Sequence, residues 1–308
     1  LRKFNVEFDK WFSERQIHRD GELKEAVQFL KDTGDVYEKD GALWLASTRY
    51  GDDKDRVVIR ENGEPTYLAA DIAYHRNKYE RGYKKMINVW GADHHGYVAR
   101  VKAAMQAFGY NPDNLEVLLL QMVALYRDGE MVKMSKRTGQ AITLDELMEE
   151  VGVDAARYFF LMRSLDSQLD FDINLAASKS NDNPVYYIQY AHARIHSIFN
   201  QAKEAGISYG DWEHTSYDSL TADIELELIK KLAAYPEEIA QSALHRAPHR
   251  IARYLYDLAS MFHSFYKQGR IMGVEPELQQ ARLGLITVIA NVLKHGLGVL
   301  GISAPEKM

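Results

Sequence analysis

The sequence predicts an α/β region followed by an all-α region. Between residues 86 and 125, short apolar segments that suit strands alternate with a helical segment, and this alternation favours a parallel sheet. After residue 140 the pattern changes, because apolar residues then recur at helical spacing in one segment after another. A succession of helices without strands between them is typical of a helical bundle.

The first 82 residues predict a helix, a hairpin and a second helix. Apolar positions at helical spacing indicate a helix over 22–31 that stops near Gly34. Asp40-Gly41 between two apolar segments predicts a tight β-hairpin, and Asn62-Gly63 predicts another turn between extended segments. We then expect a helix from about Thr66 to Gly82.

The following residues predict the sheet. Met86–Trp90 suits a short strand, 97–108 a helix, and the apolar segment Leu115–Leu125 a central strand buried on both faces. Asn181-Asp182-Asn183-Pro184 predicts a boundary, because Pro suits the first turn of a new helix. The helices expected after residue 140 cover 143–150, 153–163, 182–205, 222–245, 248–268 and 276–300.

Length and composition limit the class of protein. The 308 residues, of which 46% are hydrophobic and 27% charged, suit about two globular domains. No uninterrupted apolar stretch approaches the length of a membrane span, and the charged first residues do not suit a secretory signal. The absence of cysteine excludes disulfides, thiol catalysis and Cys-ligated zinc, and we expect a cytoplasmic protein. The net charge of −6 requires any nucleic-acid site to gather basic residues on one face.

The segment Lys133-Met134-Ser135-Lys136-Arg137 is the strongest chemical signal. It lies between the apolar strand and a helix start at Thr143. The ammonium groups of Lys133 and Lys136 could neutralise the charge that accumulates when a phosphoryl bond breaks. The competing interpretation is a solvated basic loop, since such spacings arise often by chance.

The turn Gly91-Ala92-Asp93-His94-His95-Gly96 follows a strand and opens a helix, the usual ligand position in an open α/β sheet. Gly91 permits close approach of a ligand, Asp93 could accept both hydroxyls of a ribose, and the helix start favours phosphate. One alternative is a helix-capping Asp93 beside incidental His94 and His95. Another is a metal-dependent phosphoesterase of the Asp-His-His type.

Three further residues suit a cationic ligand. Tyr67 and Asp71 stand one helical turn apart and face the same direction. Glu14 together with Asp71 could bracket a guanidinium group, whose planar fork of donors matches carboxylates. The alternative for all three is an ordinary solvated surface.

In the helical half, aromatic and basic residues interleave at the start of the helix over 182–205. Tyr187 and Tyr190 are the best candidates for exposed rings on which unpaired bases could stack, with Arg194 one turn further along. The alternative is core packing.

These segments together resemble bacterial arginyl-tRNA synthetases over essentially the whole chain. The matching motifs are F-D-x-W-F-S-E, G-D-D-K-D-R-V, T-Y-L-A-A-D-I-A-Y-H, V-W-G-A-D-H-H-G-Y, K-M-S-K-R, V-D-A-A-R-Y-F-F-L, N-P-V-Y-Y-I-Q-Y and S-A-P-E-K-M. The K-M-S-K and G-x-D-H motifs are shared by many class I synthetases, whereas the D-A-A-R and N-P-V-Y-Y-I-Q-Y motifs point to the arginine enzymes.

The resemblance implies three parts. A partial Rossmann-like catalytic domain with an insertion remnant would cover residues 1–126. The K-M-S-K loop and a connecting helical segment would cover 127–180, and a helical anticodon-binding domain 181–308. The partners implied are ATP with Mg²⁺, arginine and tRNA(Arg), with no tightly bound cofactor and no protein-bound metal. The family also implies a monomer.

The resemblance assigns roles to the candidate residues. Glu14, Tyr67, Asp71 and His94 would bind arginine, and Gly91, Asp93, His95 and Met134 would bind ATP. Lys133, Ser135 and Lys136 would act in catalysis. Contacts to tRNA would come from Tyr187, Tyr190, Arg194 and Met308.

One departure concerns the H-x-G-H signature of class I synthetases, which this sequence lacks. His94-His95-Gly96-Tyr97 does not supply it, because it ends in tyrosine and lies at a different sheet position. The first half of the catalytic sheet is therefore expected to be missing, which predicts an inactive or weak fragment. A tRNA-binding module without catalysis is the alternative function.

Overall fold

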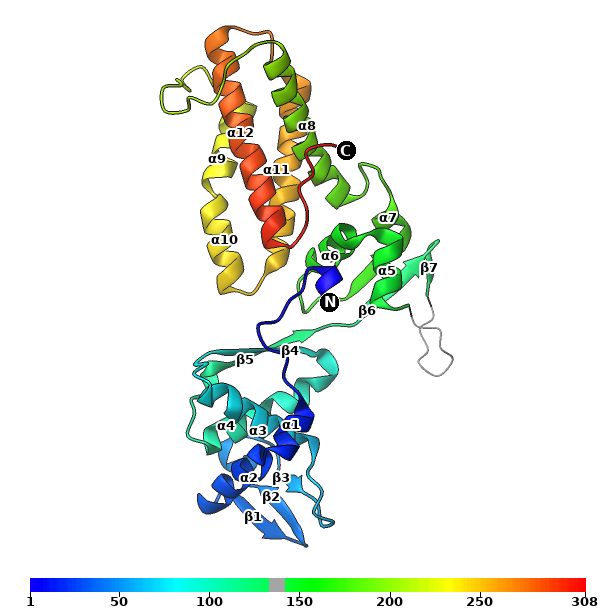
Figure 1. Ribbon diagram of the computed structural model, residues 1–308, viewed down its shortest axis with the longest axis vertical. Coiled ribbons are helices and arrows are strands. Elements are labelled where there is room, and N and C mark those ends of the chain that lie inside the picture. The colour runs from blue at the N-terminus through cyan, green and yellow to red at the C-terminus, as the bar shows by residue number, and fades with distance from the viewer. Residues whose placement is uncertain (133–141) are drawn as a thin grey trace. The chain divides into compact units, whose positions relative to one another are not determined.

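The computed structural model describes residues 1–132 and 142–308, and the chain divides into two compact units (Figure 1). One unit is Phe8–Met122, here the 8–122 unit. The other is Leu1–Glu7 with Val123–Met308, here the bundle unit. The predicted class is confirmed, because a mixed α/β region with short parallel sheets precedes a helical region.

The 8–122 unit follows the predicted order of elements closely, with one additional short helix at its start. Its helices are α1 (Glu14–Arg19), α2 (Glu22–Asp32), η2 (Ser47–Tyr50), α3 (Tyr67–Glu80), η3 (Ala92–Tyr97), α4 (Val98–Ala107) and η4 (Pro112–Asn114). Its strands are β1 (Val36–Lys39), β2 (Ala42–Leu45), β3 (Arg56–Ile59), β4 (Met86–Gly91) and β5 (Leu115–Leu120).

The first sheet of this unit is antiparallel in the order β1-β2-β3. Its predicted hairpin is confirmed, since Lys39 pairs with Ala42 across the turn. Asp40 and Gly41 both have positive φ (52° and 73°), the backbone that a two-residue hairpin turn requires. The same unit buries Leu30 of α2, Ile72 of α3 and Met105 of α4 in one core.

The second sheet pairs β4 and β5 in parallel. Met86 and Leu115 are buried in the core, whereas Ile87 and Val89 on the other face are 42% and 60% exposed. A parallel sheet normally has both faces covered. Within the 8–122 unit, this sheet is covered on one face only.

The prediction of one strand over Leu115–Leu125 was wrong. Residues Leu115–Leu120 pair with all of β4, and that pairing ends at Gly91↔Leu120. The chain then leaves the sheet through Met122, which is 77% exposed, and enters a different sheet of the bundle unit as β6. Periodicity could not show this break, because the residues stay apolar on both sides of it.

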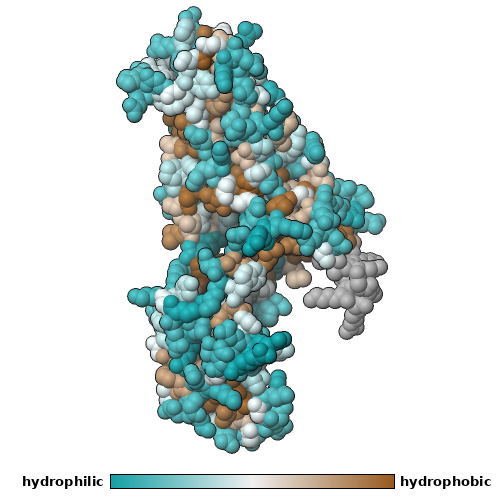
Figure 2. All heavy atoms as spheres, in the orientation of Figure 1, coloured by the Kyte–Doolittle hydropathy of each residue, from teal (hydrophilic) through white to brown (hydrophobic). Residues whose placement is uncertain are grey.

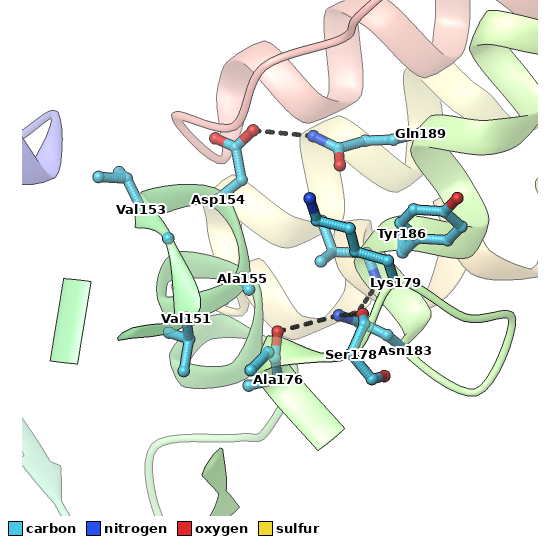
Figure 3. Close-up of a pocket in the computed structure, with 13 residues that line it drawn as sticks. Val151, Val153, Asp154, Ala155, Ala176, Ser178, Lys179, Asn183, Tyr186 and Gln189 are labelled. Carbon is cyan, nitrogen blue, oxygen red and sulfur yellow. Dashed lines mark hydrogen bonds between the residues drawn. The ribbon is translucent and has the colours of Figure 1, made fainter. Parts of the chain in front are cut away.

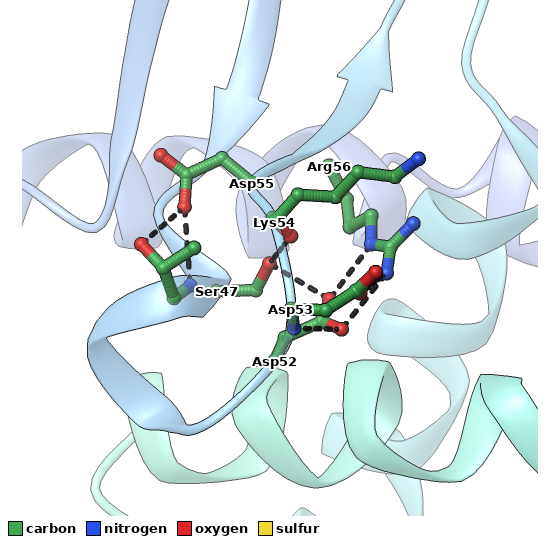
Figure 4. Close-up of polar contacts among 7 residues, drawn as sticks. Ser47, Asp52, Asp53, Lys54, Asp55 and Arg56 are labelled. Carbon is green, nitrogen blue, oxygen red and sulfur yellow. Dashed lines mark hydrogen bonds and ion pairs between the residues drawn. The ribbon is translucent and has the colours of Figure 1, made fainter.

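A buried ion pair fixes the loop between η2 and β3 (Figure 4). Arg56 donates from Nε to Asp52 at 2.7 Å, and Ser47 Oγ donates to the same carboxylate at 3.0 Å. The Arg56 hydrogen bond holds the pKa of Asp52 well below its ordinary value. This part of the G-D-D-K-D-R-V motif is therefore structural.

The bundle unit contains a small mixed sheet and a set of packed helices. Its sheet has the order β7-β6-β8, with β6–β7 antiparallel and β6–β8 parallel. The strands are β6 (Val123–Arg127), β7 (Glu130–Met131) and β8 (Leu169–Asp172). The helices are η1 (Arg2–Phe4), α5 (Leu144–Val151), α6 (Val153–Leu161), α7 (Ile173–Ala177), α8 (Pro184–Glu204), α9 (Asp223–Ala233), α10 (Tyr235–Leu244), α11 (Pro248–Gln268) and α12 (Pro276–Val299).

The prediction of a single helix over 222–245 was wrong, because α9 and α10 are separate helices. Pro236 lies in the first turn of α10, where its missing N–H leaves no hydrogen bond unmade. The preceding chain bends at Ala234, which is shared by the end of one helix and the start of the next.

Helix α12 has the length and composition of a possible membrane span, the one such helix among the described residues. It lies inside the bundle, where Ile286, Ile289 and Leu293 are completely buried. An apolar helix that is buried by its neighbours is expected in a protein core. On the face shown in Figure 2, hydrophobic side chains reach the surface as patches among hydrophilic ones.

Candidate functional site

An acidic pocket of about 250 Å³ lies between α1 and α3 in the 8–122 unit. Glu14 stands in the first turn of α1, after Ser13 at the helix start. Thr66 immediately precedes α3, and its hydroxyl donates to the carbonyl of Val57 in β3 at 3.0 Å. That bond fixes the start of α3 against the sheet. The residues that line the pocket are Phe12, Glu14, Ile17, Tyr67, Ala70, Asp71 and Tyr74.

The structure thus brings together the three residues that the sequence grouped as a possible site for a cationic ligand. Glu14, Tyr67 and Asp71 line one cavity, with Tyr67 82% exposed. Phe12 stacks on Tyr74 with ring centroids 4.6 Å apart and supplies an aromatic wall. Carboxylates beside aromatic faces suit a cation that carries an apolar stem.

One cation lies near the two carboxylates: Lys78 Nζ stands 4.3 Å from the centroid of the Tyr74 ring, and the charge of Asp71 partly offsets the lowering of the Lys78 pKa by burial. Within the described residues, no Lys or Arg forms an ion pair with Glu14 or Asp71, and His18 Nε2 lies 4.0 Å from Glu14 Oε1. Asp71 Oδ2 instead accepts a hydrogen bond of 2.7 Å from the hydroxyl of Tyr97. Two carboxylates in one open cavity favour a positively charged ligand.

Sequence reasoning missed the aromatic residues around this pocket, as well as the smaller lining side chains of Ile17 and Ala70. Tyr74 could have been found, because 67, 70, 71 and 74 form one stripe along a helix. Phe12 and Tyr97 gave no such signal, since only tertiary packing brings them to α3. Burial raises the pKa of the Tyr97 phenol, and its hydrogen bond to Asp71 raises it further, so this hydroxyl remains a donor at neutral pH.

The turn after β4 has the predicted strand-to-helix form. Gly91 ends the strand, and the following η3 carries Asp93, His94 and His95, all exposed. A Cβ atom on Gly91 would stand 2.6 Å from Asp93 Oδ1, so glycine is needed for Asp93 to take this position. His94 Nε2 lies 3.8 Å from Asp93 Oδ2.

The predicted catalytic segment falls where the structure gives no description. Lys133, Met134, Ser135 and Lys136 lie outside the described residues. The helix start after it is as expected, because Thr143 caps α5 in a reciprocal arrangement with Glu146.

Tyr187, Tyr190 and Arg194 gather where α8 meets α11. The rings of Tyr187 and Tyr190 lie 4.5 Å and 5.7 Å from that of His263. The Arg194 guanidinium lies over Tyr190 and Tyr266, at 5.1 Å and 4.9 Å from their centroids. Tyr187 and Tyr190 are half-buried rather than exposed, because both rings pack near His263 of α11.

The segment just before Met308 contacts another face of α8. The C-terminal segment is held by His192, whose Nδ1 donates to the carbonyl of Pro305 at 2.9 Å, and by His196 near Glu306. At 100° per residue, positions 192 and 196 lie on the face of α8 opposite 190 and 194. Met308 itself is half exposed.

A second cavity, of about 350 Å³, lies between α6, α7 and the start of α8 (Figure 3). Gln189 donates to Asp154 at 2.8 Å, and Asn183 donates to the carbonyl of Ala176 at 3.0 Å. None of the predicted site residues that the structure describes lines it. Its Asp154 also accepts from the backbone N–H of Ser303, so the D-A-A-R motif helps to hold the C-terminal segment.

Comparison with known protein families identifies this combination of units. Residues 3–168 match the family model described as tRNA synthetases class I (R), catalytic domain, which is more than half of the chain. The chain belongs to the class I arginyl-tRNA synthetase family. Residues 188–308 match the DALR anticodon binding domain, within the bundle unit.

Curated arginyl-tRNA synthetase relatives align with the whole chain. The arginine–tRNA ligase of Carboxydothermus hydrogenoformans is 56% identical over 308 residues, and that of Moorella thermoacetica is 54% identical. In both cases the alignment covers 100% of this chain and 55% of the relative. The chain therefore spans about half the length of the arginyl-tRNA synthetases it matches.

Solved structures of arginyl-tRNA synthetases give the same result. A proposed arginyl-tRNA synthetase from Campylobacter jejuni superposes with a TM-score of 0.90 at 41% identity, covering 100% of this chain and 66% of that one. The Thermus thermophilus arginyl-tRNA synthetase has a TM-score of 0.83 at 25% identity, covering 100% of this chain and 61% of that one. The family match replaces the metal-dependent phosphoesterase interpretation of Asp93-His94-His95.

Proposed function

We propose that this chain forms part of an arginine–tRNA ligase, which activates arginine with ATP and transfers it to tRNA(Arg). The observation that carries the proposal is the acidic pocket of Glu14 and Asp71 in a chain of the arginyl-tRNA synthetase family. A guanidinium is planar, carries a full charge and presents five donors, so it suits two carboxylates that form no ion pair with a Lys or Arg of the described residues.

In the proposed reaction, Glu14 and Asp71 hold the guanidinium and Tyr67 closes over the side chain. The carboxylate of arginine attacks the α-phosphorus of ATP, and pyrophosphate leaves as the adenylate forms. A ribose hydroxyl at the tRNA end then attacks the activated carbonyl, and AMP leaves. His94 stands near the substrate amine in this scheme.

The nucleotide would be bound by the turn after β4 and by the K-M-S-K segment. Asp93 accepts the ribose hydroxyls, while Gly91, His95 and Met134 contact the nucleotide. Lys133 and Lys136, with Ser135 between them, neutralise the charge on the α-phosphate and the departing pyrophosphate. Mg²⁺ would arrive with ATP, and we assign it no protein ligand.

Two measurements test this function. Calorimetry on this chain should detect arginine binding, with citrulline as the uncharged control of the same shape. In the intact enzyme, Lys136→Ala should slow adenylate formation by roughly 10²–10³-fold while arginine affinity stays the same. An equal loss in both quantities would contradict the transition-state role of Lys136.

A tRNA-binding role of the bundle unit is the second candidate. It is favoured by the DALR match over 188–308 and by the cluster of Tyr187, Tyr190 and Arg194. We propose that these residues, together with Met308, contact tRNA(Arg). Filter binding over a salt series tests it, because phosphate contacts make affinity fall as salt rises. The three-part division at 126 and 180, a monomeric state and a cytoplasmic location also remain predictions.

A further inference from the structure

The hydrogen bond between Tyr97 and Asp71 joins a residue outside the pocket to one inside it. Tyr97 donates to Asp71 Oδ2 at 2.7 Å, yet Tyr97 is not among the residues that line the cavity. It therefore contacts the carboxylate from outside the cavity, and among the described residues Asp71 Oδ1 has no hydrogen-bond donor.

We infer that Tyr97 is a positioning residue, which fixes the carboxylate of Asp71 so that the pocket distinguishes a guanidinium from a simple ammonium group. This inference rests on the proposed function of the pocket. It concerns how Asp71 is oriented and adds no further contact to the ligand.

Tyr97 is itself held by rigid elements. It ends η3 and precedes the first turn of α4. Its ring lies 5.7 Å from that of Trp90 in β4, and the Arg100 guanidinium lies 5.6 Å from its centroid. A ring packed between a strand residue and a helix residue can aim its hydroxyl at one point on α3.

The Tyr97 hydroxyl is neutral, so its hydrogen bond does not cancel the charge of Asp71. In the same unit Asp52 is bound by the guanidinium of Arg56, which both orients the carboxylate and neutralises it. Tyr97 orients Asp71 without neutralising it, because a phenol carries no charge. The negative charge of Asp71 remains available to a cationic ligand, in a fixed direction.

A fixed direction is useful for one class of cation in particular. A guanidinium binds through N–H groups in a rigid fork, so its acceptors have to stand at set positions. An ammonium is a compact charge with rotatable donors and tolerates acceptors in several positions. Loss of the Tyr97 hydroxyl should therefore weaken arginine binding more than the binding of a primary amine.

The test compares Tyr97→Phe with Tyr37→Phe in this chain. Tyr37, which lies in β1, also donates to a carboxylate, that of Asp55 at 2.8 Å. Neither Tyr37 nor Asp55 lines the pocket. Calorimetry should show arginine affinity falling about 5- to 10-fold in Tyr97→Phe and staying unchanged in Tyr37→Phe. Affinity for lysine should change less than twofold, so the arginine-to-lysine ratio falls.

Equal arginine affinity in wild type and Tyr97→Phe would overturn the inference, and so would equal losses for arginine and lysine. Absence of arginine binding in the wild-type chain would instead count against the proposed function. A ligand-free measurement then decides the role of Tyr97. The Hα–Hβ couplings of Asp71 should report one side-chain rotamer in wild type and averaging in Tyr97→Phe, and a single rotamer in both would overturn the inference.

Discussion

In the bundle unit, Glu225 is almost completely buried, and Arg282 Nε lies 2.7 Å from its Oε1. In the 8–122 unit, Glu14 and Asp71 share a cavity in which no described Lys or Arg pairs with them. The Asp52–Arg56 pair shows that the 8–122 unit also compensates a buried acid elsewhere. The absence of an ion-paired Lys or Arg among the described residues is thus specific to the pocket. The negative charges of Glu14 and Asp71 therefore remain able to attract a cationic ligand.

The largest effect should come from breaking the compensated pair. Arg282→Met would leave Glu225 buried without its partner, which costs roughly 3–5 kcal/mol of unfolding free energy. Chemical denaturation measures this change. Arginine affinity should stay the same, because neither residue lines the pocket, and a stability loss below 1 kcal/mol would contradict a structural role for the pair.

A substitution in the pocket should change arginine affinity and leave stability nearly unchanged. Asp71→Asn removes a charge that forms no ion pair within residues 1–132 and 142–308, so stability should change by less than about 0.5 kcal/mol. Arginine affinity should fall roughly 10- to 100-fold, since a hydrogen bond to a charged group is lost. Calorimetry and denaturation on the same variant give both values. The comparison fails if Asp71→Asn destabilises the fold and leaves arginine affinity unchanged.

A smaller effect concerns His75, which stands one turn after Asp71 on α3. Burial lowers its pKa, while Nδ1 donates to the carbonyl of Asp71 at 2.7 Å and Nε2 accepts from Asn88. The unfolded chain therefore takes up the proton more readily than the folded one. The contribution of His75 to the free energy of unfolding is complete above about pH 6.5. It falls as the pH drops from there toward the pKa of His75 in the folded protein, by at most about 1.4 kcal/mol per pH unit.

Denaturation between pH 7.5 and 5 measures that slope. His75→Gln should reduce this slope without abolishing it, because burial also lowers the pKa of His192 and of His263. An identical slope in wild type and His75→Gln would show that other groups cause the pH dependence.

Much of the secondary structure was predictable because its signals are local. Asp40-Gly41 specified a hairpin turn through its positive φ, and Pro184 specified the start of α8. The failures had non-local causes. The break after Leu120 depends on where its partner β4 ends, and the half-burial of Tyr187 and Tyr190 depends on α11.

The sequence by itself determined the residue types, the spacing of Tyr67 and Asp71 on one helical face, and the motifs of the family. Helical periodicity is a property of consecutive residues, so it needs no knowledge of the fold. Only the tertiary structure decided that Glu14 of α1 joins that face and that Tyr97 reaches Asp71 from outside the cavity. Those contacts join residues 26 or more positions apart, and packing alone brings such residues together.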